Sequence, residues 1–207
     1  MNIKIASLLI CSVLLNSCQE SRYHSGYHAI LRSFKPVFVN HFPLKMSEGT
    51  TYRSKSAEYN LTYLFLYQRI EKSQFLKLFE VTKNEYTEKY NAADSCLLVI
   101  NMFTTQKNLT QNNKATSTDL LTLKDKCLKN KSPVPNFYNL DITLDSTRCK
   151  LPTGFELFIV DAKSGIYWDE KYLTDGKYMP EDWKHGYSKG IAMNEETLEV
   201  IYWFVIW

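Results

Sequence analysis

The sequence predicts an α+β fold, with a mainly antiparallel sheet and one main helix packed on it. Three observations support this prediction. The C-terminal third is rich in short apolar runs separated by turn residues, which is typical of strands. Residues 73–92 carry aromatic side chains close to helical spacing. The last stretch, residues 198–207, is almost continuously apolar and predicts a strand that is covered on both faces.

The first part of the predicted domain, which runs from residue 29 to residue 207, is expected to be irregular. Pro36 and Pro43 interrupt the apolar positions there, and proline breaks regular elements. Residues 46–56 are polar and predict a loop. Residues 59–70 are dense in aromatic and branched side chains, so they fit either a strand or the start of a helix.

The clearest helix is predicted over residues 73–92. Ser73 is a suitable N-cap, because its hydroxyl can accept a hydrogen bond from a free backbone N–H of the first turn. Aromatic side chains recur from Phe75 to Tyr90, with charged residues between them. That pattern is more typical of a helix face packed on a core than of a binding groove.

The middle of the chain has one apolar run and two longer polar stretches. Residues 96–103 are apolar between polar neighbours, which predicts a short buried strand. Residues 104–118 are rich in Asn, Thr and Lys and predict a surface loop. Residues 119–128 predict a short helix that ends before Pro133 and Pro135.

The C-terminal third predicts strands at residues 155–160, 166–168, 191–193 and 198–207. Residues 161–165 and 194–197 have the composition of turns, and the second suits a hairpin loop of four residues. We expect the last strand at the centre of the sheet, because it offers no polar face to water.

Size and charge exclude some functions. The chain of 207 residues is long enough for one domain with a substantial core. Its formal net charge of +3 falls by one, to +2, if Lys4 is removed with a signal peptide. The basic residues are scattered, so we expect no nucleic-acid partner. The sequence also lacks a metal-ligand spacing and a glycine-rich phosphate loop, so no metal or cofactor is expected.

The N-terminus has the layout of an export signal. Lys4 gives a short positive region, and residues 5–15 form an apolar segment. This segment is shorter than the ~20 residues that a membrane-spanning helix needs. Ser17 and Cys18 close it. This order of charge, short apolar core and small residue is typical of a cleaved signal peptide, here residues 1–17.

The sequence Leu15-Asn16-Ser17-Cys18 resembles the lipobox of bacterial lipoproteins. The resemblance implies that Cys18 is acylated and becomes the first residue after cleavage. Residues 18–28 would then be a polar tether between the lipid and the domain. Two or more acyl chains hold a protein firmly on a bilayer. By analogy with small lipoproteins of Gram-negative bacteria, we expect a cell-envelope protein that is lipid-anchored to the outer membrane, facing the periplasm or the exterior.

The cysteines of the mature chain predict one disulfide. Besides Cys18, the chain keeps Cys96, Cys127 and Cys149, and an exported protein meets an oxidising compartment. Cys96 opens an apolar run and is the best candidate for a buried free thiol. This favours a Cys127–Cys149 pair, although the sequence leaves the other pairings open.

Residues 186–190 match G-x-S-x-G, the nucleophile elbow of α/β-hydrolases. That elbow needs a strand before the serine, a helix after it and a histidine later in the chain. Here all histidines precede Ser188: His24, His28, His41 and His185. The two glycines therefore predict turn geometry. An envelope serine hydrolase that uses Ser188 with His185 or His41 is kept as the alternative function, because triads are defined by geometry and not by order.

An aromatic segment between the predicted strands is the candidate binding surface. It carries Trp168, Tyr172, Tyr178, Trp183 and Tyr187 among acidic residues. Exposed aromatic rings beside hydrogen-bonding groups would suit a protein or glycan partner. The competing interpretation is that these rings pack down onto the sheet. The expected function is accordingly a non-enzymatic binding or structural role at the membrane.

Overall fold

The computed structural model describes residues 25–47, 49–55, 62–100, 127–128, 130–137, 147–173 and 179–207. The chain divides into two compact units, Met1–Glu48 and Gly49–Trp207. The predicted signal peptide, Cys18, the loop at 104–118 and nearly all of the helix predicted at 119–128 lie outside the described residues.

The first unit contains a helix at residues 25–33 and the short helix α2, Pro36–Val39. Pro36 starts α2, where its fixed φ suits a first helical position. The hydroxyl of the buried Tyr27 donates to the carbonyl of Pro43 at 2.8 Å. The helix at 25–33 includes the last four residues of the predicted tether. In the described part of the chain, every helix is too short or too polar to cross a membrane.

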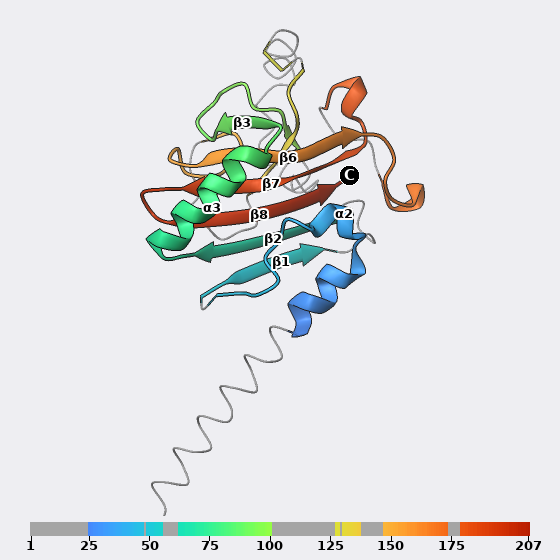
Figure 1. Ribbon diagram of the computed structural model, residues 1–207. Coiled ribbons are helices and arrows are strands. Elements are labelled where there is room, and N and C mark those ends of the chain that lie inside the picture. The colour runs from blue at the N-terminus through green and yellow to red at the C-terminus, as the bar shows by residue number, and fades with distance from the viewer. Residues whose placement is uncertain are drawn as a thin grey trace, which may run out of the picture. The chain divides into compact units, whose positions relative to one another are not determined.

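Strands of the second unit form a six-stranded sheet in the order β1-β2-β8-β7-β6-β3, with every neighbouring pair antiparallel (Figure 1). Their bounds are β1 Thr51–Lys55, β2 Thr62–Arg69, β3 Glu88–Asn91, β6 Glu156–Ser164, β7 Gly186–Asn194 and β8 Glu199–Ile206. With helix α3, Lys72–Glu85, lying over this sheet, the predicted α+β class is confirmed. Residues 51–55, predicted as loop, are the edge strand β1.

Helix α3 packs on one face of the sheet through aromatic contacts. The ring of Phe79 meets that of Phe158 on β6, with centroids 5.8 Å apart. The helix starts at Lys72 without a side-chain cap and ends at Glu85, so both the predicted Ser73 cap and the predicted end at 92 are wrong. The backbone N–H and the hydroxyl of Thr87 both donate to the carbonyl of Ile159, which draws the chain into β3.

The opposite face of the sheet carries the main core. Its buried side chains include Phe65, Phe137, Leu157 and Trp203. The ring of Phe137 packs edge-on against Trp203, with centroids 5.7 Å apart. Two short parallel strands, β4 Val99–Ile100 and β5 Val134–Pro135, contribute to the same core. Of the strand predicted at 96–103, β4 is the part that the structure describes as strand.

The predicted centre of the sheet is confirmed. Strand β8 lies between β2 and β7, and its residues from Val200 onward are buried. A four-residue loop joins β7 to β8, one position later than predicted, because Asn194 pairs with Glu199. Leu198 closes this loop with φ of 57°.

The predicted turn at residues 161–165 is wrong, because β6 continues through it to Ser164. A bulge between Ile159 and Asp161 absorbs one residue, after which pairing with β7 resumes. The chain turns instead at Gly165, whose φ of 127° is accessible to glycine. The strand predicted at 166–168 is likewise absent.

The predicted turn at residues 186–190 is wrong, because these residues form the first half of β7. A Cβ atom on Gly190 would lie 2.3 Å from the carbonyl oxygen of Phe158 and 2.4 Å from the ring of Trp203. A Cβ on Gly186 would lie 2.7 Å from the carbonyl oxygen of Lys163. The glycines of the G-x-S-x-G pattern therefore make room for a neighbouring strand and for an indole.

Candidate functional site

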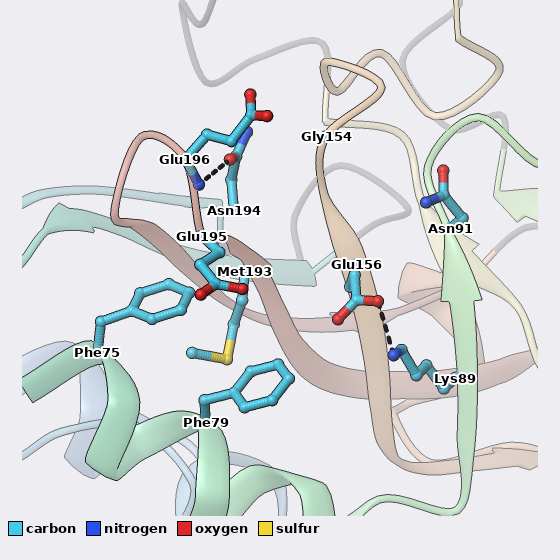
Figure 2. A pocket seen from close by; sticks show the side chains of 10 residues that line it. All are labelled: Phe75, Phe79, Lys89, Asn91, Gly154, Glu156, Met193, Asn194, Glu195 and Glu196. Atoms are coloured by element: carbon cyan, nitrogen blue, oxygen red, sulfur yellow. Dashed lines mark hydrogen bonds and ion pairs between the residues drawn. The ribbon is translucent and has the colours of Figure 1, made fainter. Parts of the chain in front are cut away.

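A pocket of about 380 Å³ opens beside α3 and the β7–β8 loop (Figure 2). It is lined by Phe75, Phe79, Lys89, Asn91, Gly154, Glu156, Met193, Asn194, Glu195 and Glu196. These residues come from α3, from β3, from the start of β6 and from the hairpin between β7 and β8. Helix α3 and β3 are neighbours in sequence, but both are far along the chain from β6 and the β7–β8 hairpin, so the pocket forms only in the folded protein.

The floor of the pocket is apolar. Phe75 and Phe79 stand one helical turn apart on α3, with ring centroids 6.3 Å apart and nearly parallel planes. Met193 approaches them from the end of β7, as Figure 2 shows. Phe75 and Met193 are each 1% exposed, so they back the floor from the core, and the half-buried Phe79 is the member of the three that a ligand can touch.

One side of the rim carries a paired charge. The ammonium of Lys89 lies 2.6 Å from a carboxylate oxygen of Glu156, on neighbouring strands. The same ammonium lies 5.4 Å from the ring centroid of Phe158, within range of a cation–π contact. Lys89 and Glu156 therefore neutralise each other at the pocket.

The hairpin loop supplies the other side of the rim. The side-chain oxygen of Asn194 accepts from the backbone N–H groups of Glu196 and Thr197, at 3.0 and 3.3 Å. These bonds hold the loop in one conformation. Figure 2 shows the carboxylate of Glu195 beside Phe75 and Met193, whereas that of Glu196 points away from α3.

Sequence reasoning missed this pocket. The aromatic stripe of α3 was interpreted as core-facing, which holds for Phe75, but Phe79 is only half-buried. The adjacent Glu195 and Glu196 were interpreted only as turn residues. The one signal in the sequence is that the acidic pair follows closely after Met193. These residues form a site only in the folded protein, where α3 lies opposite them.

Ser188 lies in the interior of the sheet. It is 0% exposed, and its hydroxyl accepts from the indole N–H of Trp203 at 3.3 Å. His185 precedes β7 and is half-buried, with its backbone carbonyl accepting from Gly165. His41 lies in the first unit and is also half-buried. A nucleophile has to reach its substrate, so the burial of Ser188 gives the hydrolase alternative no support.

The three described rings of the aromatic segment, Trp168, Trp183 and Tyr187, do not form one exposed surface. Tyr187 is 3% exposed, and its hydroxyl donates to Asp161 at 2.5 Å. Burial, and then this bond to a carboxylate, raise the pKa of Tyr187. Trp183 packs beside Trp207, whose indole N–H donates to the carbonyl of Trp183 at 3.0 Å. Trp168 is half-buried.

Tyr178 and the side chain of Tyr172 lie outside the described residues.

Within the described ranges, no three His, Cys, Asp or Glu side chains gather as a metal site would require.

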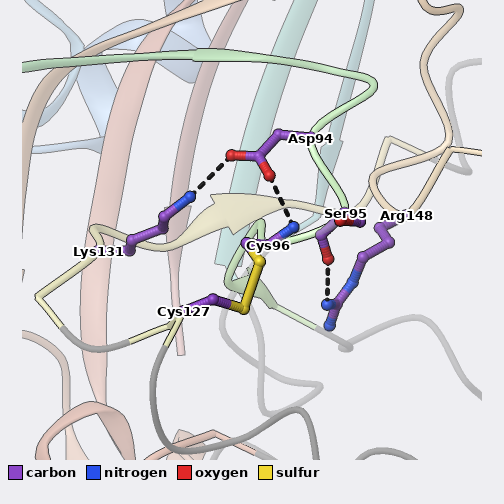
Figure 3. Close-up of a disulfide and its surroundings, with 6 residues drawn as sticks. All are labelled: Asp94, Ser95, Cys96, Cys127, Lys131 and Arg148. Carbon is purple, nitrogen blue, oxygen red and sulfur yellow. Dashed lines mark hydrogen bonds and ion pairs between the residues drawn. A yellow bond between two sulfur atoms is a disulfide. The ribbon is translucent and has the colours of Figure 1, made fainter.

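The disulfide joins Cys96 to Cys127, so the favoured Cys127–Cys149 pair is wrong (Figure 3). The free thiol is Cys149, which is buried in the core, and burial raises its pKa. Spacing along the chain carried no information on which thiols meet. The buried segment near Cys149 packs under the sheet, whereas Cys96 lies at the start of the run that leads to β4.

Polar contacts surround the disulfide. One oxygen of Asp94 accepts from the backbone N–H of Cys96 and the other from Lys131, each at 2.7 Å. Arg148 donates to the carbonyl of Ser95 at 2.7 Å. These contacts link the two sides of the disulfide-closed segment to its neighbours (Figure 3).

These contacts predict a pH dependence. Burial opposes ionisation of Asp94, but hydrogen bonds from Lys131 and Cys96 outweigh it and lower the pKa of Asp94. The stability that ionised Asp94 gives the folded protein is therefore complete above the pKa of an unfolded aspartate, about 3.9. It is lost as the pH falls through the lower pKa of Asp94 in the folded protein. We expect Asp94→Asn to destabilise by about 1 kcal/mol at neutral pH and less in acid. Thermal unfolding of the variant and the wild type across pH measures this difference. An equal loss of stability at neutral and at acidic pH would contradict the prediction.

Comparison with known proteins finds no matching family model, no matching curated protein and no matching solved structure. A function for this chain therefore has to be argued from its own residues.

Proposed function

We propose that the mature chain is a cell-envelope lipoprotein, anchored to the outer membrane through acylated Cys18, that binds a small ligand in the pocket beside α3. The observation that carries the binding role is the pocket itself, with its apolar floor of Phe75, Phe79 and Met193 and its polar rim. The role is non-enzymatic.

The lipobox-like sequence and the disulfide support the location. Leu15-Asn16-Ser17-Cys18 has the pattern at which lipoproteins are acylated. A disulfide between Cys96 and Cys127 is the chemistry of an oxidising compartment, which an exported protein reaches. These two observations are independent, because they concern different parts of the chain.

The composition of the pocket supports binding rather than catalysis. Its volume falls in the range of small-ligand sites, and its lining combines apolar side chains with polar and charged ones. Among the described residues that line it, there is no serine, cysteine or histidine, and the carboxylates are either paired with Lys89, as Glu156 is, or exposed, as Glu195 and Glu196 are. The half-buried ring of Phe79 favours contact with an apolar body.

Loss of the lipid tests the anchor. We expect Cys18→Ala to remain an unprocessed precursor, because the residue that accepts the acyl chains is gone. Intact-mass measurement of the wild-type protein should show acyl mass on an N-terminal Cys18, and the variant should keep residues 1–17. Normal cleavage and release of the Cys18→Ala protein would contradict the proposal.

Methyl NMR tests the pocket. The probe is 2-phenylethanol, titrated into mature lipidated protein in phosphatidylcholine nanodiscs, with ¹³C-methyl methionine labels. We expect the Met193 methyl signal, assigned with Met193→Leu, to shift in a saturable way. The signals of Met46 and Met179, which do not line the pocket, serve as controls. A uniform shift of all signals would indicate non-specific partitioning and argue against a binding pocket.

A further inference from the structure

The charges around the pocket do not balance. Lys89 and Glu156 form a close ion pair, with 2.6 Å between nitrogen and oxygen. Glu195 and Glu196 are exposed, and no ion pair joins either of them to a lysine or arginine in the part of the chain that the structure describes. The pocket therefore carries an excess of negative charge at its hairpin side.

The two carboxylates differ in their relation to the apolar floor. Figure 2 shows Glu195 reaching toward Phe75 and over Met193, whereas Glu196 extends to the far side of the loop. Asn194 holds the backbone of the loop by accepting from the Glu196 N–H, and the two glutamates leave that backbone at successive positions. One carboxylate thus lies at the mouth of the pocket, beside a thioether and an aromatic ring.

The floor is itself suited to a positive charge. Aromatic faces attract cations through their quadrupole, and the ammonium of Lys89 already lies over the ring of Phe158 at 5.4 Å. Phe79 meets Phe158 edge-on and stacks near Phe75, so its half-buried ring is the aromatic surface that lies between Lys89 and Glu195 in the pocket lining. An apolar ligand with a positive group would find both a surface and a partner charge.

We propose that the pocket selects a small organic cation with an apolar body, whose ammonium pairs with Glu195 while its body lies on Phe79, above the buried Phe75 and Met193. This inference rests on the proposed binding function. An anionic ligand of the same size would meet the repulsion of two carboxylates, and a neutral one would lose the charge pair. Exposed charge pairs are weak, so the selectivity should be modest and salt-sensitive.

Three probes of matched size test the selectivity: 2-phenylethylammonium, 2-phenylethanol and 3-phenylpropanoate. Each is titrated into the lipidated protein in zwitterionic nanodiscs, with the Met193 methyl shift as readout. We expect the cation to bind about two- to five-fold more tightly than the alcohol, the range of one exposed charge pair, and the carboxylate to bind least. Raising the salt concentration should reduce the difference.

Two neighbouring substitutions separate recognition from general charge. Glu195→Gln should bring the affinity for the cation down to that for the alcohol, and leave the alcohol unchanged. Glu196→Gln removes the same charge from the same loop but should retain most of the preference, because that side chain points away. Both residues are exposed, so neither substitution should affect folding.

The outcomes distinguish this inference from the proposed function. If the alcohol and the cation bind equally well at the Met193 methyl, the pocket binds ligands but the charge selectivity is wrong. Equal effects of the two glutamine variants would overturn the specific role of Glu195. If none of the three probes shifts Met193, both the inference and the binding function fail.

Discussion

Gly190→Ala is expected to destabilise the protein by at least about 3 kcal/mol or to prevent folding. The new methyl group would lie 2.3 Å from the carbonyl oxygen of Phe158 and 2.4 to 2.6 Å from two ring atoms of Trp203. Neither neighbour can yield, because one is the backbone of the adjacent strand and the other a fully buried indole at the centre of the sheet. Overpacking of this kind forces the strands apart.

Urea unfolding followed by tryptophan fluorescence measures this effect. Gly154→Ala is the matched control, since its methyl group would meet only the end of the Asn194 side chain, at 3.0 Å. We expect a change of about 1 kcal/mol for that control, because a contact of 3.0 Å is relieved by a shift of a few tenths of an ångström, which lets Asn194 keep its hydrogen bonds to the loop. A Gly190→Ala protein with the wild-type midpoint would show that β7 is not packed against Trp203 in this way.

Removal of the disulfide is expected to destabilise the protein by about 3 to 4 kcal/mol, the chain-entropy value for a loop of this length. The bond joins residues 31 positions apart, so it restricts the unfolded chain substantially. The test variant is the double substitution of Cys96 and Cys127 by serine, which leaves no reactive thiol unpaired at the site. Reduced wild-type protein should unfold at the same denaturant concentration as this variant.

Cys149→Ala provides the control, because it removes a buried thiol but keeps the disulfide. We expect a loss of about 1 kcal/mol from the small cavity. Peptide mapping without reduction should recover Cys96 linked to Cys127, with Cys149 alkylated only after unfolding. A recovered peptide pair that contains Cys149 would contradict the structure.

Elements that depend on local pattern were predictable. The continuous apolar run from Val200 to Ile206 demands cover on both faces, so a central position in the sheet follows directly. The hairpin loop before it was predicted within one residue, because turn composition is also local. Helix α3 was predicted from its aromatic spacing, but its C-terminal end was not. The chain leaves the helix where Thr87 donates a hydrogen bond to Ile159, which belongs to a strand far along the sequence.

The candidate site was much less predictable than the fold. The serine pattern and the aromatic segment drew attention because of residue type, yet Ser188 and Tyr187 are buried in the sheet. The pocket was missed because its floor and its charged rim come from separate parts of the chain. Phe79 and Glu195 are far apart in sequence and meet only once α3 lies on the sheet.

The sequence by itself determined the α+β class and the place of the last strand, because the spacing of apolar residues along the chain follows directly from which faces of a helix or strand are buried. It also carries the whole argument for a lipid on Cys18, which rests on a short linear pattern. The tertiary structure alone decided the disulfide partners, the need for Gly190 and the pocket beside α3. Each of these depends on which distant groups come into contact, and that is a property of packing rather than of any local pattern.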